Sequence, residues 1–440
     1  MIFNSSKYNK HWLDKRLYDL GTFKRGKSRH RPRNDSKLFE NGTYPLVQTG
    51  EVKEANLYIR SHGANYNDLG LAQSQMWQKN TLCITIAANI AETALLGYPM
   101  CFPDSVVGFN AHPDESSEIF MHYVFTYIRR AIQNSASGSI QDNINIDYLT
   151  GLKFKIPEKP YQDKITNILS ALDDKIELNN RINTELEAMA KTLYDYWFVQ
   201  FDFPISKEQA EAMANTALEG KPYKTSGGKM TYSPTLNREI PDEWEVESIL
   251  ESCSVIDCLH SKKSDFCFEN EKCYLLQLEN ILDNGLVDVS NRYYVSKADY
   301  ETWTSRIEVR HNDIVMTNAG RIAAFAQVPD YVECGIGRNI TAIRPNSICP
   351  NYFFLSLSGL DLQKQIQTNL DHGAFFKSFN VKGIKALNLV RPNPDIEKGF
   401  EGIVLPMNEK RHLAMRENQH LTQLRDWLLP MLMNGQVTVK

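Results

Sequence analysis

The sequence predicts a mixed α/β (α+β) protein in which two equivalent globular domains alternate with two long helices. Three observations lead to this prediction: a repeat at an offset of about 230 residues, short β-rich runs within each copy, and a long helical pattern after each copy. A chain of 440 residues is also long enough for two or three domains. We expect the two helices to pair as an antiparallel coiled coil about a pseudo-twofold axis.

The repeat is carried by several segments that occur in the same order in both copies. Trp12–Gly26 aligns with Trp244–Cys258 at an offset of 232, and Asn145–Pro157 aligns with Asn380–Pro392 at an offset of 235. Each match is weak, but the constant order and offset indicate a duplication rather than a short-period array. The predicted first domain, first helix, linker, second domain and second helix are residues 1–157, 158–204, 205–240, 241–395 and 396–440.

Each globular domain is predicted to combine short strands with one helical segment late in the copy. The strands are separated by Gly, Asn, Asp and Pro, as is typical of short strands joined by turns. The β-rich runs are Thr81–Ile86, Tyr274–Leu278, Asp313–Thr317 and Ile340–Ile343, and the helical segments are Ile119–Ile132 and Tyr352–Leu370.

The segment Gln162–Val199 is predicted to form the first long helix because it contains no Gly or Pro and its apolar residues recur in steps of three and four. Asn179 and Asn183 fall on the resulting seam, where a buried asparagine fixes register at some cost in stability. The 235-residue offset continues through this helix and places Asn183 over Asn418. The alternative is that each helix packs separately on its own domain.

The linker, residues 205–240, is predicted to contain a short helix followed by an exposed connector rich in Gly, Ser, Pro and Lys. The chain start lacks the apolar core of a signal peptide and no run is long enough to span a bilayer, so we expect a cytoplasmic protein. Its eight cysteines match no common zinc spacing, which favours buried reduced thiols over a metal site.

Charge is distributed unevenly along the chain. Residues 1–157 hold 18 Lys and Arg against 14 Asp and Glu, which gives +4, whereas residues 241–395 hold 15 against 21, which gives −6. Neutralising phosphates supplies most non-specific DNA affinity, and the chain outside residues 1–157 is acidic overall, so we expect the chain alone to bind DNA weakly. A basic partner protein would have to supply the remaining phosphate contacts.

Motifs that would support catalysis are absent from the sequence. There is no phosphate-binding P-loop, no GxSxG or HExxH, and no Asn/Asp-Pro-Pro-aromatic motif of amino-methyltransferases. Carboxylate pairs such as Asp173-Asp174 lie on the predicted coiled coil, where a solvated face is the simpler explanation. We therefore predict no catalytic residues, no metal ligands and no cofactor in this chain.

The strongest signal for nucleic-acid binding is a basic run in the first copy, from Lys24 to Arg33. Gly and Pro interrupt it, so we expect a flexible loop that contacts phosphates or the minor groove. Its cationic side chains predicted to bind DNA are Lys24, Arg25, Lys27, Arg29, Arg31 and Arg33. The alternative is a loop that is merely solvated. The second copy has no counterpart to this basic loop, and Lys262 and Lys263, which stand in its place, are the DNA-binding candidates there.

Gln, Asn and Arg side chains near the repeated strands are the candidates for reading bases, because Asn and Gln pair with adenine and Arg with guanine in the major groove. Taken singly, each is more simply explained as a structural residue. The candidates are Gln48 and Asn89 in the first copy, and Gln277, Asn318, Arg321, Arg338 and Asn339 in the second.

An aromatic run, Leu193–Pro204, closes the first long helix. Exposed aromatic clusters mark interfaces, so Tyr194, Trp197 and Phe198 are candidate contacts for a partner subunit. The alternative is a local core where the helix meets the linker.

Together, the two-copy plan, the stretch Gln162–Asn183, the aromatic run Leu193–Pro204 and the connector Ser226–Tyr232 with Arg238–Trp244 resemble the specificity subunits of type I restriction–modification enzymes. The resemblance covers essentially the whole chain. It implies that each globular domain is a target recognition domain that reads one half of a bipartite double-stranded DNA site, with the coiled coil setting the spacer.

The resemblance also implies the partners. Two methyltransferase subunits would dock on the helices and supply S-adenosylmethionine chemistry, and two ATP- and Mg-dependent translocase–nuclease subunits would add restriction. Three other interpretations remain at this point: a tethering protein with duplicated protein-binding domains, an enzyme of unrecognised type, and a specificity subunit of a methylation-only system.

Overall fold

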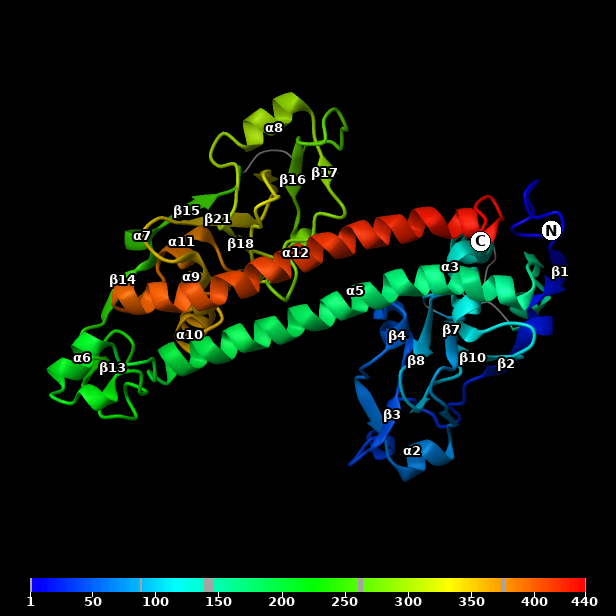
Figure 1. Cartoon of the computed structure of the whole chain (residues 1–440), viewed down its shortest axis with the longest axis horizontal. Coiled ribbons are helices and arrows are strands. Elements are labelled where there is room, and N and C mark those ends of the chain that lie inside the picture. The colour runs from blue at the N-terminus through cyan, green and yellow to red at the C-terminus, as the bar shows by residue number, and fades with distance from the viewer. Residues whose placement is uncertain (1, 88, 138–145, 260–263, 373–376, 440) are drawn as a thin grey trace. The chain divides into compact units, whose positions relative to one another are not determined.

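The computed structural model describes residues 2–87, 89–137, 146–259, 264–372 and 377–439. It divides into two compact units: unit 1, Met1–Leu178 with Asn418–Lys440, and unit 2, Asn179–Glu417. Each unit contains a globular domain together with one part of each long helix (Figure 1). None of the helices within the described ranges combines the length and apolar character needed to cross a membrane.

Unit 1 contains two short-stranded sheets and a two-stranded ribbon. The first sheet has the order β2 (Gly21–Arg25), β10 (Val106–Ala111), β7 (Leu82–Thr85), β8 (Thr93–Leu96) and β4 (Tyr58–Ile59). The second has the order β5 (Ala64–Tyr66), β3 (Tyr44–Leu46), β9 (Met100–Cys101) and β6 (Met76–Trp77). The ribbon pairs β1 (Leu13–Arg16) with β11 (Lys153–Ile156). The helices are α1 (Thr49–Glu54), α2 (Asp68–Ala72), α3 (Glu118–Ser137) and α4 (Ile146–Gly151), with 3-10 turns at Leu17–Leu20 and Ser36–Leu38.

Unit 2 repeats this plan. One sheet has the order β15 (Cys253–Asp257), β21 (Ile340–Pro345), β18 (Ile314–Thr317) and β19 (Phe325–Gln327), and another has β17 (Tyr293–Tyr294), β16 (Tyr274–Leu276) and β20 (Gly335–Ile336). The ribbons pair β14 (Glu245–Ser248) with β24 (Asn388–Arg391), β12 (Met230–Ser233) with β13 (Arg238–Pro241), and β22 (Asp371–His372) with β23 (Lys377–Ser378). The helices are α6 (Lys207–Ala212), α7 (Ile249–Ser252), α8 (Lys297–Trp303), α9 (Pro350–Ser356), α10 (Leu360–Thr368) and α11 (Val381–Lys385), with 3-10 turns at Thr216–Leu218 and Leu278–Asn280.

The duplication inferred from the sequence is present in the strand register. Leu13 pairs with Ile156 in unit 1, and Glu245, its equivalent at an offset of 232, pairs with Arg391, the equivalent of Ile156 at 235. The sheet order β2-β10-β7-β8 recurs as β15-β21-β18-β19. The two copies thus share the order of these four strands, to which unit 1 adds β4, although few of their residues are identical.

The two long helices are α5 (Lys159–Tyr194), which ends in a π-helical turn over Asp195–Val199, and α12 (Pro394–Met433). In unit 2 they pair antiparallel, because the side-chain amide of Asn179 donates to Glu417 at 2.7 Å and the Arg411 guanidinium donates to Glu187 at 2.9 Å. In unit 1 an ion pair of 2.6 Å joins Asp173 of α5 to Arg425 of α12.

The predicted seam is buried where the apolar pattern placed it. In unit 1 the side chains of Ile165 and Leu169 pack with Leu429 and Leu432 in one hydrophobic cluster. Asn179 and Asn183 are 2% and 6% exposed, as a position inside the helix pair requires. The contacts between α5 and α12 exclude the alternative in which each helix packs only on its own domain.

The linker is more folded than the sequence indicated. The short helix α6 is present, but the residues after it form the β12–β13 hairpin and return to the core of unit 2. Phe203 stacks on Tyr223 at 4.6 Å between ring centroids, and both belong to the same buried cluster as Trp244. Most of residues 221–239 are exposed or half-buried, as expected of a connector, but Tyr223 is buried and covers part of the aromatic cluster that follows α5.

Candidate nucleic-acid interface

The loops that follow β7 and β18 have the same hydrogen-bonded structure in both copies. Thr85 accepts a hydrogen bond from the backbone N–H of Glu92 at 3.0 Å, and Thr317 accepts one from the N–H of Ala324 at 3.1 Å. Each hydroxyl also donates across the loop, to the carbonyl of Asn89 in one case and of Arg321 in the other. Asn89 and Arg321 therefore occupy equivalent positions on equivalent loops.

The two loops also share a left-handed backbone residue, since Ala91 has φ of 60° and Ala323 has φ of 56°. A non-glycine residue in this region is uncommon and is held there by its surroundings. In unit 1 helix α3 supplies that support: the Arg129 guanidinium donates to the carbonyl of Ala91 at 3.2 Å, and Gln133 donates to that of Ile90 at 2.9 Å. Sequence reasoning missed these two supporting residues, because the pairing needs the helix to lie beside the loop.

Arg321 is already engaged within its own domain. Its guanidinium forms an ion pair with Asp283 at 2.5 Å and donates to the carbonyls of Leu278 and Ile281. Its side chain is nevertheless 42% exposed. Arg321 would therefore have to exchange partners before it could make a bidentate contact with guanine.

The second-copy candidates lie on three chain segments that the fold brings together. The backbone N–H of Asn318 donates to the carbonyl of Asn339 at 2.8 Å. Gly337, which precedes Arg338, lies so close to Gln277 that a Cβ there would stand 2.7 Å from its Nε2. Arg338 and Asn339 are exposed and Gln277 is half-buried, whereas Asn318 is buried and accepts a hydrogen bond from Thr341 at 3.0 Å.

In the first copy Gln48 is exposed and lines a pocket of about 380 Å³. Gln48 is the N-cap of α1, and its backbone N–H donates to the Glu51 carboxylate at 3.1 Å. Gln277 caps a 3-10 turn in the same way, with its N–H donating to Asn280 at 2.7 Å. Other walls of the first-copy pocket come from the basic run, through Ser28 and Arg33, and from the β7–β8 loop, through Ala87.

The basic run is anchored to the domain rather than loosely attached. A Cβ on Gly26 would lie 2.3 Å from the carbonyl oxygen of Pro103, so only glycine allows this close approach. Gln73 accepts hydrogen bonds from the backbone N–H groups of Arg29 and His30 at 2.7 and 3.1 Å. A hydrogen bond from His30 lowers the pKa of Asp35.

The six cations of the run fall into two groups. Arg31 and Arg33 share the carboxylate of Asp104, at 3.5 and 2.7 Å. The other four are exposed, and within the described ranges no carboxylate pairs with them; they are Lys24, Arg25, Lys27 and Arg29. These four are available to neutralise phosphates. Lys262 and Lys263, the candidates in the second copy, lie outside the described residues.

The aromatic run at the end of α5 is part of the core of unit 2. Tyr194, Trp197 and Phe198 are 8%, 7% and 4% exposed and pack with Tyr352 and Phe400. Burial raises the pKa of the Tyr194 hydroxyl. The three side chains thus do not form an exposed docking surface, which corrects the prediction that they contact a partner and agrees with the alternative of a local core.

Comparison with known proteins identifies the family. Residues 9–188 match the model of the type I restriction modification DNA specificity domain. The chain is 24% identical to the HindI specificity subunit of Haemophilus influenzae, over 92% of this chain and 97% of that protein. It is 21% identical to the MjaIX specificity subunit of Methanocaldococcus jannaschii, over 99% and 95%. The chain belongs to the type I restriction–modification specificity subunits.

The fold agrees with this assignment. A crystal structure of a type I restriction–modification S subunit from M. genitalium matches 98% of this chain and 99% of its own, with a TM-score of 0.56 and 16% sequence identity. The predicted family and the predicted fold of duplicated domains with two long helices are both confirmed. The tethering-protein interpretation is not favoured for this specificity subunit.

Proposed function

We propose that this specificity subunit reads a bipartite double-stranded DNA site, with residues 1–157 reading one half and residues 241–395 reading the other. One observation carries the proposal: Gln48 and Gln277, and likewise Asn89 and Arg321, occupy equivalent places in two domains of one topology. Asn89 and Arg321 are different side chains at equivalent places on equivalent loops, which suits two domains that read different half-sites.

In the proposed complex, residues 158–204 and 396–440 set the distance between the half-sites and hold the methyltransferase subunits. Large apolar side chains on the two helices remain exposed and are suited to such an interface: Met189, Leu413 and Trp427 are 53%, 59% and 57% exposed. Residues 205–240 connect the first helix to the second domain.

The chemistry in this proposal belongs to separate subunits. Two methyltransferase subunits would methylate adenine with S-adenosylmethionine, and two ATP-dependent nuclease–translocase subunits would cut unmodified DNA. The charge distribution supports the need for partners, because the second domain carries −6 and the whole chain −4. Phosphate contacts from a partner would compensate for this acidic surface.

The proposal is tested by expressing the chain with the methyltransferase subunit encoded beside it and mapping modified adenines across the host genome. We expect one bipartite motif with a fixed spacer, which disappears when this chain is omitted. Deleting one heptad from α5 and the facing heptad from α12 should alter the spacer and leave both half-sites unchanged. Methylation without this chain, or a complex that forms but modifies no site, would contradict the proposal.

A further inference from the structure

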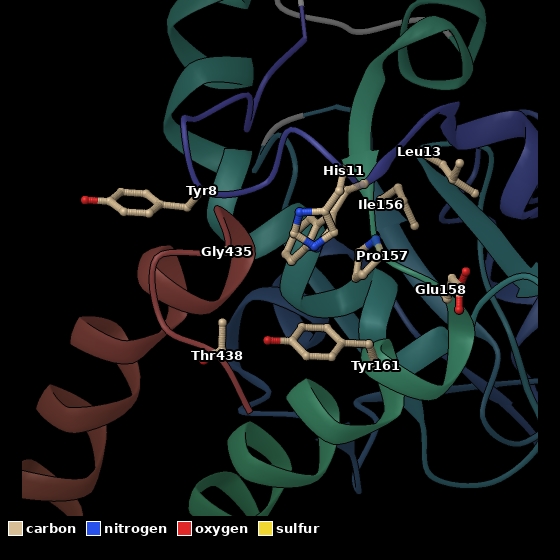
Figure 2. A pocket seen from close by; sticks show the side chains of 10 residues that line it. Tyr8, His11, Leu13, Ile156, Pro157, Glu158, Tyr161, Gly435 and Thr438 are labelled. Carbon is tan, nitrogen blue, oxygen red and sulfur yellow. The ribbon is translucent and has the colours of Figure 1, made fainter. Parts of the chain in front are cut away.

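A pocket of about 370 Å³ opens in unit 1 beside Trp12, where the N-terminal segment, the start of α5 and the residues after α12 meet (Figure 2). Its walls are mainly aromatic and apolar, with one carboxylate. The lining includes Tyr8, His11, Trp12, Tyr161, Glu158 and Thr438.

The pocket joins a buried wall to an exposed apolar rim. Trp12 is 7% exposed and its ring lies 6.0 Å from that of Tyr161. Tyr8 and Leu13, by contrast, are 45% and 52% exposed. Aromatic and apolar side chains left uncovered around a hollow are typical of a binding site.

Unit 2 contains the equivalent site, and there it is filled. Trp244 corresponds to Trp12, and its ring stacks on Phe203 at 5.1 Å with an interplanar angle of 22°. Phe203 is completely buried between Trp244 and Tyr223. Ile240, the counterpart of Tyr8 at an offset of 232, is only 3% exposed.

Thr438 stands where unit 2 has Phe203, at the offset of 235 that relates the two long helices. The backbone confirms this alignment one residue earlier. The N–H of Asp202 donates to the carbonyl of Tyr196 at 3.0 Å, and the N–H of Val437 donates to that of Met431 at 3.1 Å. Replacing a phenyl ring by the small side chain of threonine leaves the space beside Trp12 open.

We propose that the pocket beside Trp12 receives an aromatic side chain from the methyltransferase subunit, in the way that the Trp244 site receives Phe203 from its own chain. The identity of this partner rests on the proposed function, whereas the ring-binding chemistry rests on the duplicated site alone. A stacked ring there would gain both apolar burial and aromatic contact.

The charged residues at the rim of the pocket indicate which charge the residues beside the bound ring should carry. The Lys7 ammonium lies 4.9 Å from the centroid of the Tyr8 ring, and Lys10 is exposed nearby in sequence, against the single lining carboxylate of Glu158. The occupant is therefore an aromatic residue with an acidic neighbour.

The test fills the pocket from within the chain. Thr438→Phe places a ring where unit 2 has one, and Thr438→Val is the matched control that adds no ring. We expect Thr438→Phe to raise the thermal unfolding midpoint of the full chain and to weaken its affinity for the methyltransferase subunit at least tenfold, while Thr438→Val changes neither. A lowered midpoint, or a raised midpoint with unchanged affinity, would overturn the proposal.

A peptide probe tests whether the pocket binds an aromatic ring, independently of the methyltransferase subunit. The heptapeptide Val-Gln-Phe-Asp-Phe-Pro-Ile, the sequence of residues 199–205, should bind the wild-type chain in calorimetry and should not bind Thr438→Phe. Its variant with alanine for the second phenylalanine should not bind either chain. If the wild-type chain failed to bind the methyltransferase subunit, the proposed function would fall, but peptide binding abolished by Thr438→Phe would still support the ring site. If the wild-type chain self-associates and Thr438→Phe does not, the pocket binds a second copy of this chain, and the methyltransferase subunit is not its partner.

Discussion

Breaking the ion pair between Asp173 and Arg425 should destabilise the packing of α5 against α12 in unit 1. The Asp173 side chain is 1% exposed and that of Arg425 is 19% exposed, and the two charged groups are 2.6 Å apart. Tyr123 donates a further hydrogen bond of 2.6 Å to the same carboxylate. Burial and the charge of Asp173 raise the pKa of Tyr123, so its hydroxyl remains protonated and able to donate.

Replacing Asp173 with alanine would leave an arginine largely buried without its main partner. Breaking such a pair costs about 3–5 kcal/mol. We expect the lower end, about 3 kcal/mol, because Arg425 keeps hydrogen bonds to Asp426 and Asn56. For a unit of about 200 residues this corresponds to a fall of roughly 6–12 °C in the unfolding midpoint.

The assay is thermal unfolding of the full chain, with hydrogen-exchange mass spectrometry assigning the loss to peptides of unit 1. The double variant Asp173→Leu with Arg425→Met should regain most of the stability, since it leaves no unpaired buried charge. Glu301→Ala is the control, because it removes an exposed pair with Lys297 at 3.9 Å. A fall of less than about 2 °C for Asp173→Ala, or a double variant no better than the single, would refute the reasoning.

Three further predictions concern DNA binding and pH. Lys27→Ala with Arg29→Ala should weaken binding of the assembled complex to all sequences alike and reduce the slope of log affinity against log salt by about 0.9 per lost phosphate contact; anisotropy titrations that show an unchanged slope would contradict this. Gln48→Ala should lose about 1–3 kcal/mol of sequence discrimination at one base pair of the first half-site, and Gln277→Ala the same at one base pair of the second. Methylome mapping that shows the wild-type motif for both variants would exclude the assignment. Burial, aided by nearby arginine charges, lowers the pKa of His122 to about 3. As pH falls below the unfolded value of about 6.5, the unfolded state therefore binds a proton that the folded state does not. Stability should drop by about 1.6 kcal/mol between pH 6.5 and 5, and His122→Gln should unfold with a smaller pH dependence. Equal slopes of stability against pH for the two chains would count against this account.

The sequence by itself determined the features that repeat or that follow a regular period. Helical periodicity located α5 and α12 and placed Asn179 in the seam, because residues buried between two paired helices recur every three or four positions. The constant offset revealed the duplication, because two copies of one topology keep their strand-forming and turn-forming residues in the same order. The basic run and the Gln48 and Gln277 pair were also visible at this level.

Tertiary structure decided which of these side chains remain available. Trp197 and Phe198 looked like an exposed patch, but Phe400 and Tyr352, more than 150 residues away in the sequence, cover them. Within the basic run, Asp104 engages Arg31 and Arg33, and in the second copy Asp283 engages Arg321. Such pairings depend on which distant segments meet, and local sequence does not encode them. The same reason accounts for the open pocket beside Trp12, because its lining residues come from the N-terminal segment, the start of α5 and the residues after α12.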